Sequence, residues 1–378
     1  MLYLDNAATT PVRPEVIEAM APYLTRWFGN PSSHHTAGEA AKGALADARA
    51  RVARVVGMRP GDVVFTSGGT ESNNLAVKGI ALGALPRGAR HVITTPIEHE
   101  SVLESADYLA RLHGFDVTLL PVDAAGRVDP ADLRGALRDD TALVSVGYAN
   151  NEVGTVQDAA ALAAIARERR VPFHLDAVQA AGWLPLRGTG ADALTIAGHK
   201  LGAPKGTGVL AVRGRIPLEP LLHGGGQERG RRSGTQDVAG AVGLATALEL
   251  AEAEREAAAK AVAAIRDAFV AAVLAAVPTA RLTGDPVRRL PGTASFTFEG
   301  TSGEAVLLEL ERRGVVSSSG SACAAGSDEP SHVLLAMGVD PATAQTAVRV
   351  TLSHAHRAPL DGVARALAAS VAAVRSAA

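Results

Sequence analysis

Cysteine and aromatic residues are scarce in this sequence. Of its 378 residues only one, Cys323, is a cysteine, and aromatic residues make up 3%. A single thiol cannot form an intramolecular disulfide, and it excludes a structural zinc site built from several cysteines. We therefore expect neither a disulfide framework nor a metal site, as is usual for a protein of the reducing cytoplasm.

An excess of one charge and long apolar runs are also lacking. The formal net charge is -2, which argues against a nucleic-acid partner or an anionic membrane surface. The longest strongly apolar helical run covers residues 269–277, far short of the ~20 residues that a membrane span requires. Residues 1–20 lack the charged and apolar regions of a signal peptide. These observations predict a cytoplasmic protein without a membrane or nucleic-acid partner.

What is present is an alternation of strand and helix patterns between residues 62 and 213. Seven short runs rich in β-branched residues are candidate strands, at 63–66, 91–95, 116–120, 142–148, 172–176, 193–197 and 208–212. Helical patterns fill the chain between most of them, for example at 71–84, 100–113 and 158–170. This alternation predicts an α/β fold with a mostly parallel seven-stranded sheet covered by helices. Ligands of such sheets bind where the strands end.

The remainder of the chain predicts flanking helices and a second, smaller α+β domain. Helical patterns precede the alternation at 13–28 and 37–56, and an alanine-rich pattern at 237–276 indicates one long helix or a helix pair. Strands are expected at 293–298, 315–318 and 347–352, with helices at 303–313 and 359–377. We predict a large domain of residues 14–250, and a small domain of residues 1–13 and 251–378. The opening segment, 3–11, is interpreted as turn-rich rather than as a core strand.

Lys200 follows the sixth candidate strand almost directly. The apolar run 191–197 stops at Gly198, and Lys200 is followed by Gly202 and Pro204. A lysine amine at a strand end can serve as a nucleophile, and its typical use is a Schiff base with a carbonyl such as that of pyridoxal phosphate (PLP). Taken alone, the window favours an ordinary surface cation; the other strand ends favour the catalytic interpretation.

Two further strand ends suit such a cofactor. Ser67-Gly68-Gly69-Thr70 opens a helix after the first strand, so its free amides can bind a phosphate, although an ordinary glycine turn capped by Thr70 fits equally. Asp176 ends the fifth strand, where a buried carboxylate needs a cationic partner. The protonated pyridine nitrogen of PLP is one such partner; a helix N-cap is the alternative.

Three more segments contain polar residues of uncertain role. His99, after the second strand, can stack on a ring, exchange protons or be structural. Asn150 and Asn151, after the fourth, are either ligand-binding amides or turn residues. The basic glycine-rich loop 223–235 suits an anion or is only a solvated loop. Cys323 lies among small polar residues, where burial is not expected, so it is a candidate nucleophile.

The order and spacing of these segments resemble the cysteine desulfurases of the NifS/IscS-like group, PLP enzymes of the class V aminotransferase fold (fold type I). The segments that carry the resemblance are Tyr-Leu-Asp-Asn-Ala-Ala-Thr-Thr at 3–10, Asn-Pro-Ser-Ser at 30–33, Thr-Ser-Gly-Gly-Thr-Glu-Ser at 66–72, Glu-His at 98–99, Asn-Asn-Glu-Val-Gly at 150–154, Asp-Ala-Val-Gln at 176–179, Gly-His-Lys at 198–200, Arg-Ser-Gly-Thr at 232–235, Ser-Ser-Gly-Ser-Ala-Cys at 318–323 and Glu-Pro-Ser-His-Val-Leu at 329–334. They cover nearly the whole chain, and the cysteine-bearing segment discriminates best.

The resemblance implies a role for each site residue. Lys200 would carry PLP covalently, His99 would stack on its ring and Asp176 would pair with the ring nitrogen. Arg349 would bind the substrate carboxylate. Asn151 and Gln179 would contact the ring oxygen, and Gly69, Thr70 and His199 would contact the phosphate. Thr235 would contact the phosphate bound by the other subunit of a homodimer.

The implied reaction removes sulfur from L-cysteine, releases alanine and leaves a persulfide on Cys323. An acceptor protein, such as an iron–sulfur scaffold or a tRNA-thiolation enzyme, would take the sulfur. His99 is a candidate for deprotonating the thiol. One departure is Ala197, where the family usually has a serine or threonine that binds the phosphate. The alternatives are a selenocysteine lyase or small-amino-acid aminotransferase of the same fold, and a non-enzymatic scaffold that binds a partner protein.

Overall fold

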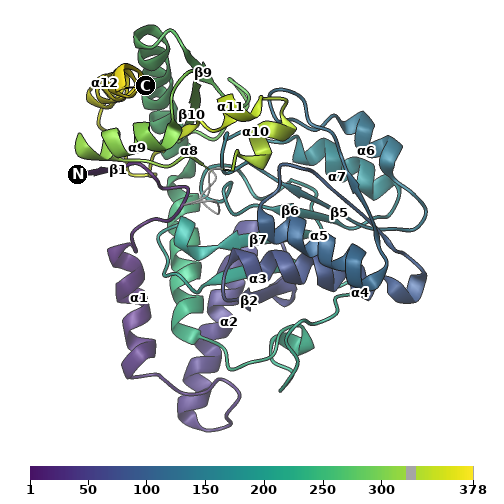
Figure 1. The fold of residues 1–378 in the computed structure, drawn as a ribbon. Helices are drawn as coiled ribbons and strands as arrows, with labels where there is room; N and C mark the ends of the chain where they lie inside the picture. The colour runs from purple at the N-terminus through teal and green to yellow at the C-terminus, as the bar shows by residue number, and fades with distance from the viewer. Residues whose placement is uncertain (321–328, 378) are drawn as a thin grey trace.

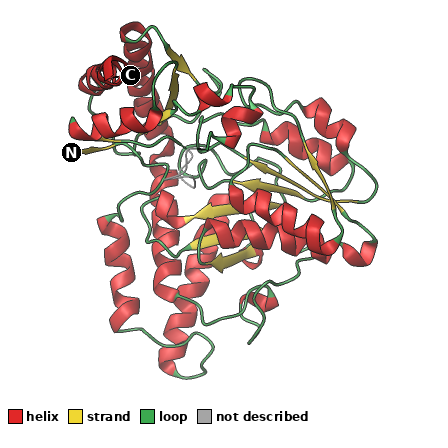
Figure 2. Cartoon of the chain, viewed as in Figure 1, coloured by secondary structure: helices red, strands yellow, loops and turns green. Residues whose placement is uncertain are grey.

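The structure is a computed structural model that describes residues 1–320 and 329–377 (Figure 1). The predicted nucleophile, Cys323, therefore lies outside the described residues. Within the described part, strands gather in one large and two small sheets, with helices around them (Figure 2). None of the helices described is both long and apolar enough to cross a bilayer.

The large sheet contains all seven predicted strands, which confirms the α/β prediction. Its strand order is β2-β8-β7-β6-β5-β3-β4. The block from β7 to β4 is parallel, whereas β8 runs antiparallel to both β2 and β7. The strands are β2 (Val63–Thr66), β3 (His91–Thr94), β4 (Asp116–Leu119), β5 (Thr141–Gly147), β6 (Phe173–Asp176), β7 (Ala193–Ala197) and β8 (Gly208–Val212).

The register of the parallel block brings several predicted site residues to one edge of the sheet. Asp176, the last residue of β6, lies opposite Gly147 of β5 and Thr195 of β7. Strand β7 runs directly into a single 3-10 turn, η4 (Gly198–Lys200). Because parallel strands all end at the same edge, Lys200 and Asp176 meet there although 24 positions separate them in the sequence.

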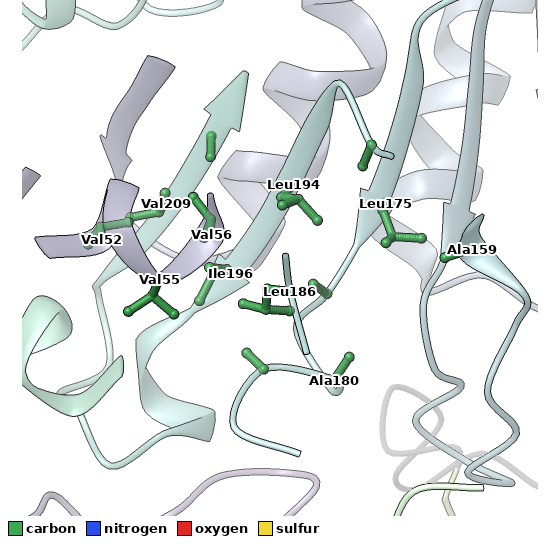
Figure 3. Packing of buried hydrophobic residues seen from close by; sticks show 14 of the residues in the cluster. Val52, Val55, Val56, Ala159, Leu175, Ala180, Leu186, Leu194, Ile196 and Val209 are labelled. Atoms are coloured by element: carbon green, nitrogen blue, oxygen red, sulfur yellow. The ribbon is translucent and has the colours of Figure 1, made fainter. Parts of the chain in front are cut away.

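Helices cover both faces of the sheet and bury its apolar side chains. They are α1 (Pro14–Thr25), α2 (Thr36–Val56), α3 (Gly69–Asn74), which continues through a π-helical turn, η2 (Leu75–Gly79), into α4 (Ile80–Gly83), then α5 (Glu100–His113), α6 (Pro130–Ala136) and α7 (Ala159–Glu168). Figure 3 shows Val52, Val55 and Val56 of α2 beside Ile196 of β7 and Val209 of β8. Helix α6 was not predicted from the sequence.

The alanine-rich pattern forms one helix, α8 (Val238–Ala276), rather than a pair. Its first half packs into the core of the large sheet through Leu244 and Leu248. Its second half packs into a separate apolar core through Val262, Phe269 and Val273. The predicted domain boundary at residue 250 thus falls within α8, and the division into two domains stays a prediction.

The second core is built on a small antiparallel sheet with the order β12-β10-β9. Its strands are β9 (Ala280–Leu282), β10 (Thr293–Phe298) and β12 (Val348–Thr351). The helices near it in the chain are α9 (Gly303–Arg312), α10 (His332–Ala336), α11 (Pro341–Ala344) and α12 (Asp361–Ala377). The α+β pattern predicted for this region is present, and β9 is an addition to it.

The opening segment joins the small sheets to the sheet edge. Its first residues form a two-residue exposed strand, β1 (Leu2–Tyr3), parallel to β11 (Val315–Val316), so the segment is not purely turns as expected. Asn6 donates to the carbonyl of Thr351 (2.7 Å), and Thr10 donates to the carbonyl of His199 (2.8 Å). Residues 5–10 therefore lie between β12 and the turn that holds Lys200.

Candidate active site

A cavity of about 390 Å³ lies at the carboxyl edge of the large sheet. Nine of the eleven predicted site residues line it: Gly69, Thr70, His99, Asn151, Asp176, Gln179, His199, Lys200 and Arg349. Thr235 is exposed and does not line it, and Cys323 lies outside the described residues. Gly320 and Glu329, the described residues on either side of the cysteine-bearing segment, do line it.

The amine of Lys200 contacts the opening segment of the chain. Its Nζ donates hydrogen bonds to the carbonyl oxygens of Ala7 and Ala8, the latter at 2.7 Å. Next to it, His199 shares a hydrogen bond with the Thr9 hydroxyl (3.1 Å). Burial, together with the charges of Lys200 and Lys205, lowers the pKa of His199 to about 4. His199 is therefore neutral at physiological pH, and Lys200 supplies the positive charge of this wall.

Asp176 contributes a carboxylate to the cavity wall. Burial raises its pKa above the ordinary value, although two hydrogen bonds oppose this effect. They come from the amide N–H of Val178 (2.9 Å) and from Nδ2 of Asn73 (2.6 Å). The first closes a turn, and among the described residues no helix lies between β6 and β7, so the helix N-cap offered as the alternative is not present. The second was not foreseen, although Asn73 lies one helical turn after Gly69 and thus on the same face of the helix.

His99 combines both interpretations that the sequence left open. It is the N-cap of α5, where its Nδ1 accepts the backbone N–H of Ser101 at 3.0 Å. The same ring also lines the cavity. The structural role therefore does not exclude a chemical one, because within residues 1–320 and 329–377 only Nδ1 of the ring makes a hydrogen bond.

Arg349 is a fully buried cation in β12, with an exposed fraction of 1%. Its Nη2 donates to the carboxylate of Asp5 and its Nη1 to the carbonyl of Asn151, both at 2.7 Å. Among the described residues its buried Nε has no hydrogen-bond partner. A guanidinium at a cavity wall suits a ligand carboxylate. Asp5 belongs to a quoted motif, but no role was predicted for it.

Small residues shape the predicted phosphate site at the start of α3. Gly68 has a φ of 154°, a conformation that favours glycine. A Cβ on Gly69 would lie 3.0 Å from Val178 Cγ2 and 3.3 Å from the Cβ of Ala197. A larger residue would therefore not fit at Gly69 without movement of these neighbours, and Gly69 and Thr70 both line the cavity. Ala197, the departure from the family pattern, also lines the cavity.

Two ion pairs hold the basic loop 223–235 against this region. Arg232 pairs with Glu71 of α3 at 2.8 Å. Arg49 of α2 makes a bidentate, buried pair with Glu228, at 2.6 and 2.7 Å. Glu228 also accepts the backbone N–H of Phe65 in β2 (3.0 Å). The loop is therefore anchored rather than merely solvated.

Two buried acids in the cavity wall were missed by the sequence analysis. Burial raises the pKa of Glu98 to about 7, against hydrogen bonds from Thr95 and from the backbone of Gly147. Burial also raises the pKa of Glu152, which accepts the hydroxyl of Ser331 at 2.5 Å. The only sequence signal for them was their place inside two quoted motifs, beside His99 and Asn151.

Comparison with known proteins places this architecture in a family. The model of the aminotransferase class-V family matches residues 2–358. Two relatives are a cysteine desulfurase IscS of Methanosarcina thermophila, 46% identical over 93% of this chain and 87% of its own length, and an IscS-like cysteine desulfurase of Mycobacterium tuberculosis, 47% identical over 100% and 98%. 

Solved structures give the same result. A NifS-like protein superimposes with a TM-score of 0.89 and 36% identity, covering 100% of this chain and 98% of that one. A structure described as SspA in complex with cysteine has a TM-score of 0.81 and 36% identity over 93% of this chain and 99% of its own. The chain therefore belongs to the class-V aminotransferase family and, within it, to the IscS- and NifS-like cysteine desulfurases.

Proposed function

We propose that this protein is a PLP-dependent cysteine desulfurase that converts L-cysteine to L-alanine and passes the sulfur to an acceptor. The observation that carries this proposal is the meeting of Lys200, Asp176, His99 and Arg349 in one cavity. An amine, a buried acid, a ring and a carboxylate-binding cation are the parts that PLP chemistry on an amino acid requires.

The residues present fit PLP. Asp176 is an acid whose pKa is raised by burial, so a cationic ring nitrogen would relieve the cost of its charge. Gly69 and Thr70, at the start of α3, line the cavity, and the backbone amides of a first helical turn suit a phosphate. The amine of Lys200 reaches the cavity between these two features. When bound, PLP supplies an aldehyde for the amine and a ring that accepts electrons from the substrate α-carbon.

The residues of the chain would then bind the substrate and move its protons. Arg349, which lines the cavity, binds the substrate carboxylate. Lys200, once released, takes the α-proton on Nζ. Asn151, Gln179, Thr70 and His199 hold the ring oxygen and the phosphate. Ala7 and Ala8 of the opening segment form part of the cavity wall beside these groups.

Cys323 is the proposed nucleophile. Its thiolate attacks the substrate sulfur, a sulfur–sulfur bond forms and the carbon–sulfur bond breaks. The electron pair of the broken bond remains with the substrate carbon, which is protonated and leaves as alanine. Since Cys323 is the only cysteine, the persulfide sulfur must pass to another molecule.

We also propose a cytoplasmic homodimer in which Thr235 reaches the phosphate of the other subunit. Thr235 is exposed and does not line the cavity of its own chain. Exposed apolar side chains on and beside α1 would be buried in such an interface. They include Leu24, which is 64% exposed, and Phe28, which is 75% exposed. The acceptor is proposed to be a protein of iron–sulfur assembly or of tRNA thiolation.

The test is a visible absorption spectrum of the purified protein before and after addition of L-cysteine. We expect a yellow cofactor band that L-cysteine perturbs, with release of sulfide and alanine in the presence of a reductant. Lys200→Ala should lose the band. Cys323→Ala should keep it and lose desulfurase activity; if that variant retained full activity, the nucleophile assignment would be wrong. Selenide release from selenocysteine, with no sulfide from cysteine, would favour the lyase alternative.

A further inference from the structure

A continuous chain of hydrogen bonds connects His99 to Asp176. Asn73 donates from Nδ2 to the Asp176 carboxylate at 2.6 Å and to the Ser101 hydroxyl at 2.9 Å. The Ser101 hydroxyl lies 2.9 Å from Nδ1 of His99. Asn73 and Ser101 are buried, at 2% and 6% exposed. The residue predicted to stack on the PLP ring and the residue predicted to pair with the ring nitrogen are thus joined through the protein.

The direction of these bonds is fixed by the groups at the two ends. The backbone N–H of Ser101 can only donate, so Nδ1 of His99 must be an acceptor. Asp176, when ionised, can only accept, so the Asn73 amide must present its NH₂ group to it. The Ser101 hydroxyl receives the second hydrogen of that NH₂ group and gives its own to His99. Each link in the chain then has one donor and one acceptor.

A neutral histidine whose Nδ1 accepts has its proton on Nε2. No hydrogen bond joins Nε2 to a residue in the described part of the chain, so this N–H is available on the cavity side. We infer that Asn73 and Ser101 are positioning residues, which hold His99 as the Nε2–H tautomer and tie it to Asp176. His99 can then donate a hydrogen bond from Nε2–H to a group in the cavity but cannot accept one there. This differs from the expectation that His99 deprotonates a thiol.

This inference deepens the proposed function and rests on it for the identity of the group that accepts the hydrogen bond from His99. The tautomer of His99 can be measured whether or not the proposed function is correct. The cofactor-free chain is labelled with ¹⁵N-histidine, and the His99 signals are assigned by their loss in His99→Gln. We expect a protonated Nε2 and an unprotonated Nδ1. A protonated Nδ1 in the neutral ring would overturn the inference, whatever the protein catalyses.

The connection to Asp176 is tested in the same spectra. Asp176→Asn should shift the His99 Nδ1 signal in the wild-type background and shift it much less in Ser101→Ala. An equal shift in both backgrounds would show an effect through space and contradict the connection. Ser105→Ala is the matched control, because Ser105 is a buried serine one turn along α5 whose hydroxyl donates to the Ser101 carbonyl (2.7 Å). It should leave the His99 signals unchanged.

The loaded enzyme gives a second readout. Loss of one net hydrogen bond is worth about 1 kcal/mol, so Ser101→Ala should lower kcat by about fivefold while KM for L-cysteine stays within about twofold. Ser101→Thr, which retains a hydroxyl, should recover most of the lost kcat. If Ser101→Thr were as slow as Ser101→Ala although both fold normally, a packing role would replace the positioning role.

Discussion

Arg349 and Asp5 form an ion pair across the cavity wall, with Nη2 and Oδ1 2.7 Å apart, although 344 positions separate them in the sequence. The side chain of Arg349 is 2% exposed and that of Asp5 is 17% exposed. The pair satisfies one edge of the guanidinium and neutralises its charge in the absence of a ligand. A substrate carboxylate therefore meets an arginine that is already held in place.

Arg349→Lys should raise KM for L-cysteine by at least about tenfold, because a lysine retains the charge but loses the fixed fork of donors. The cofactor absorbance should be unchanged, since Arg349 is not a predicted cofactor contact. Steady-state kinetics and the spectrum check both points. An unchanged KM would remove Arg349 from the carboxylate site.

Glu98 should make stability depend on pH. Because its pKa in the folded chain is raised to about 7, the folded state binds its proton more tightly than the unfolded state does. This contribution is complete below pH 4.5 and is lost as the pH rises through about 7. The rise in the pKa of Glu98 from 4.5 to about 7 corresponds to roughly 3 kcal/mol in the free energy of unfolding.

Glu98→Gln, which cannot ionise, should therefore gain stability relative to wild type as the pH rises from 4.5 to 8. Thermal midpoints of the cofactor-free proteins across this range are the measurement. Other buried acids are common to both proteins and cancel in the difference. Parallel pH profiles for the two proteins would show that Glu98 does not titrate in this interval.

The buried pair of Arg49 and Glu228 should be costly to break from one side. Arg49→Met leaves a buried carboxylate without a counter-ion, and we expect a loss of about 3–5 kcal/mol in the free energy of unfolding. The double variant Arg49→Met/Glu228→Gln should recover part of this loss. Arg134→Met, which breaks the exposed pair with Glu168, serves as the control and should change nothing measurable. Equal losses of unfolding free energy in Arg49→Met and Arg134→Met would contradict the expectation.

Gly208→Ala should weaken cofactor binding without touching the cavity. A Cβ on Gly208 of β8 would lie 2.5 Å from the carbonyl carbon of Gly68, so the start of α3 must move. Gly43→Ala is the control, because a Cβ at this position in α2 meets nothing within 4 Å and should stabilise the helix by about 0.4–1 kcal/mol. Titration of each apo-protein with PLP gives the affinities. Wild-type affinity in a folded Gly208→Ala would show that the glycine loop does not hold the phosphate.

The sequence was sufficient for the sheet but not for the interactions between distant segments. Six of the seven strands are largely buried, and buried strands leave apolar runs that can be recognised in the sequence, whereas β4 is partly exposed. The short helix α6 has too few residues for a clear period, and β9 is only three residues long. The direction of β8 was not predictable, since pattern alone does not distinguish antiparallel from parallel pairing.

The candidate site shows the same contrast. Lys200 and Asp176 could be found because each directly follows a strand. Asn73 could not, because asparagine in the first turns of a helix is unremarkable until its partner is known. Asp5 and Glu228 pair with arginines far away in the chain, and no local pattern records such a partner. Glu98 and Glu152 look like surface acids in the sequence, and only the fold shows that they are buried.

The contacts of the opening segment have a consequence for synthesis of the chain. Asp5 and Asn6 find their partners, Arg349 and Thr351, only after nearly the whole chain has left the ribosome. At about 5–20 residues per second, that delay is on the order of tens of seconds. The large sheet can form in the meantime, but the carboxylate-binding half of the cavity cannot. Synthesis thus imposes an order in which the proposed cofactor site precedes the proposed substrate site.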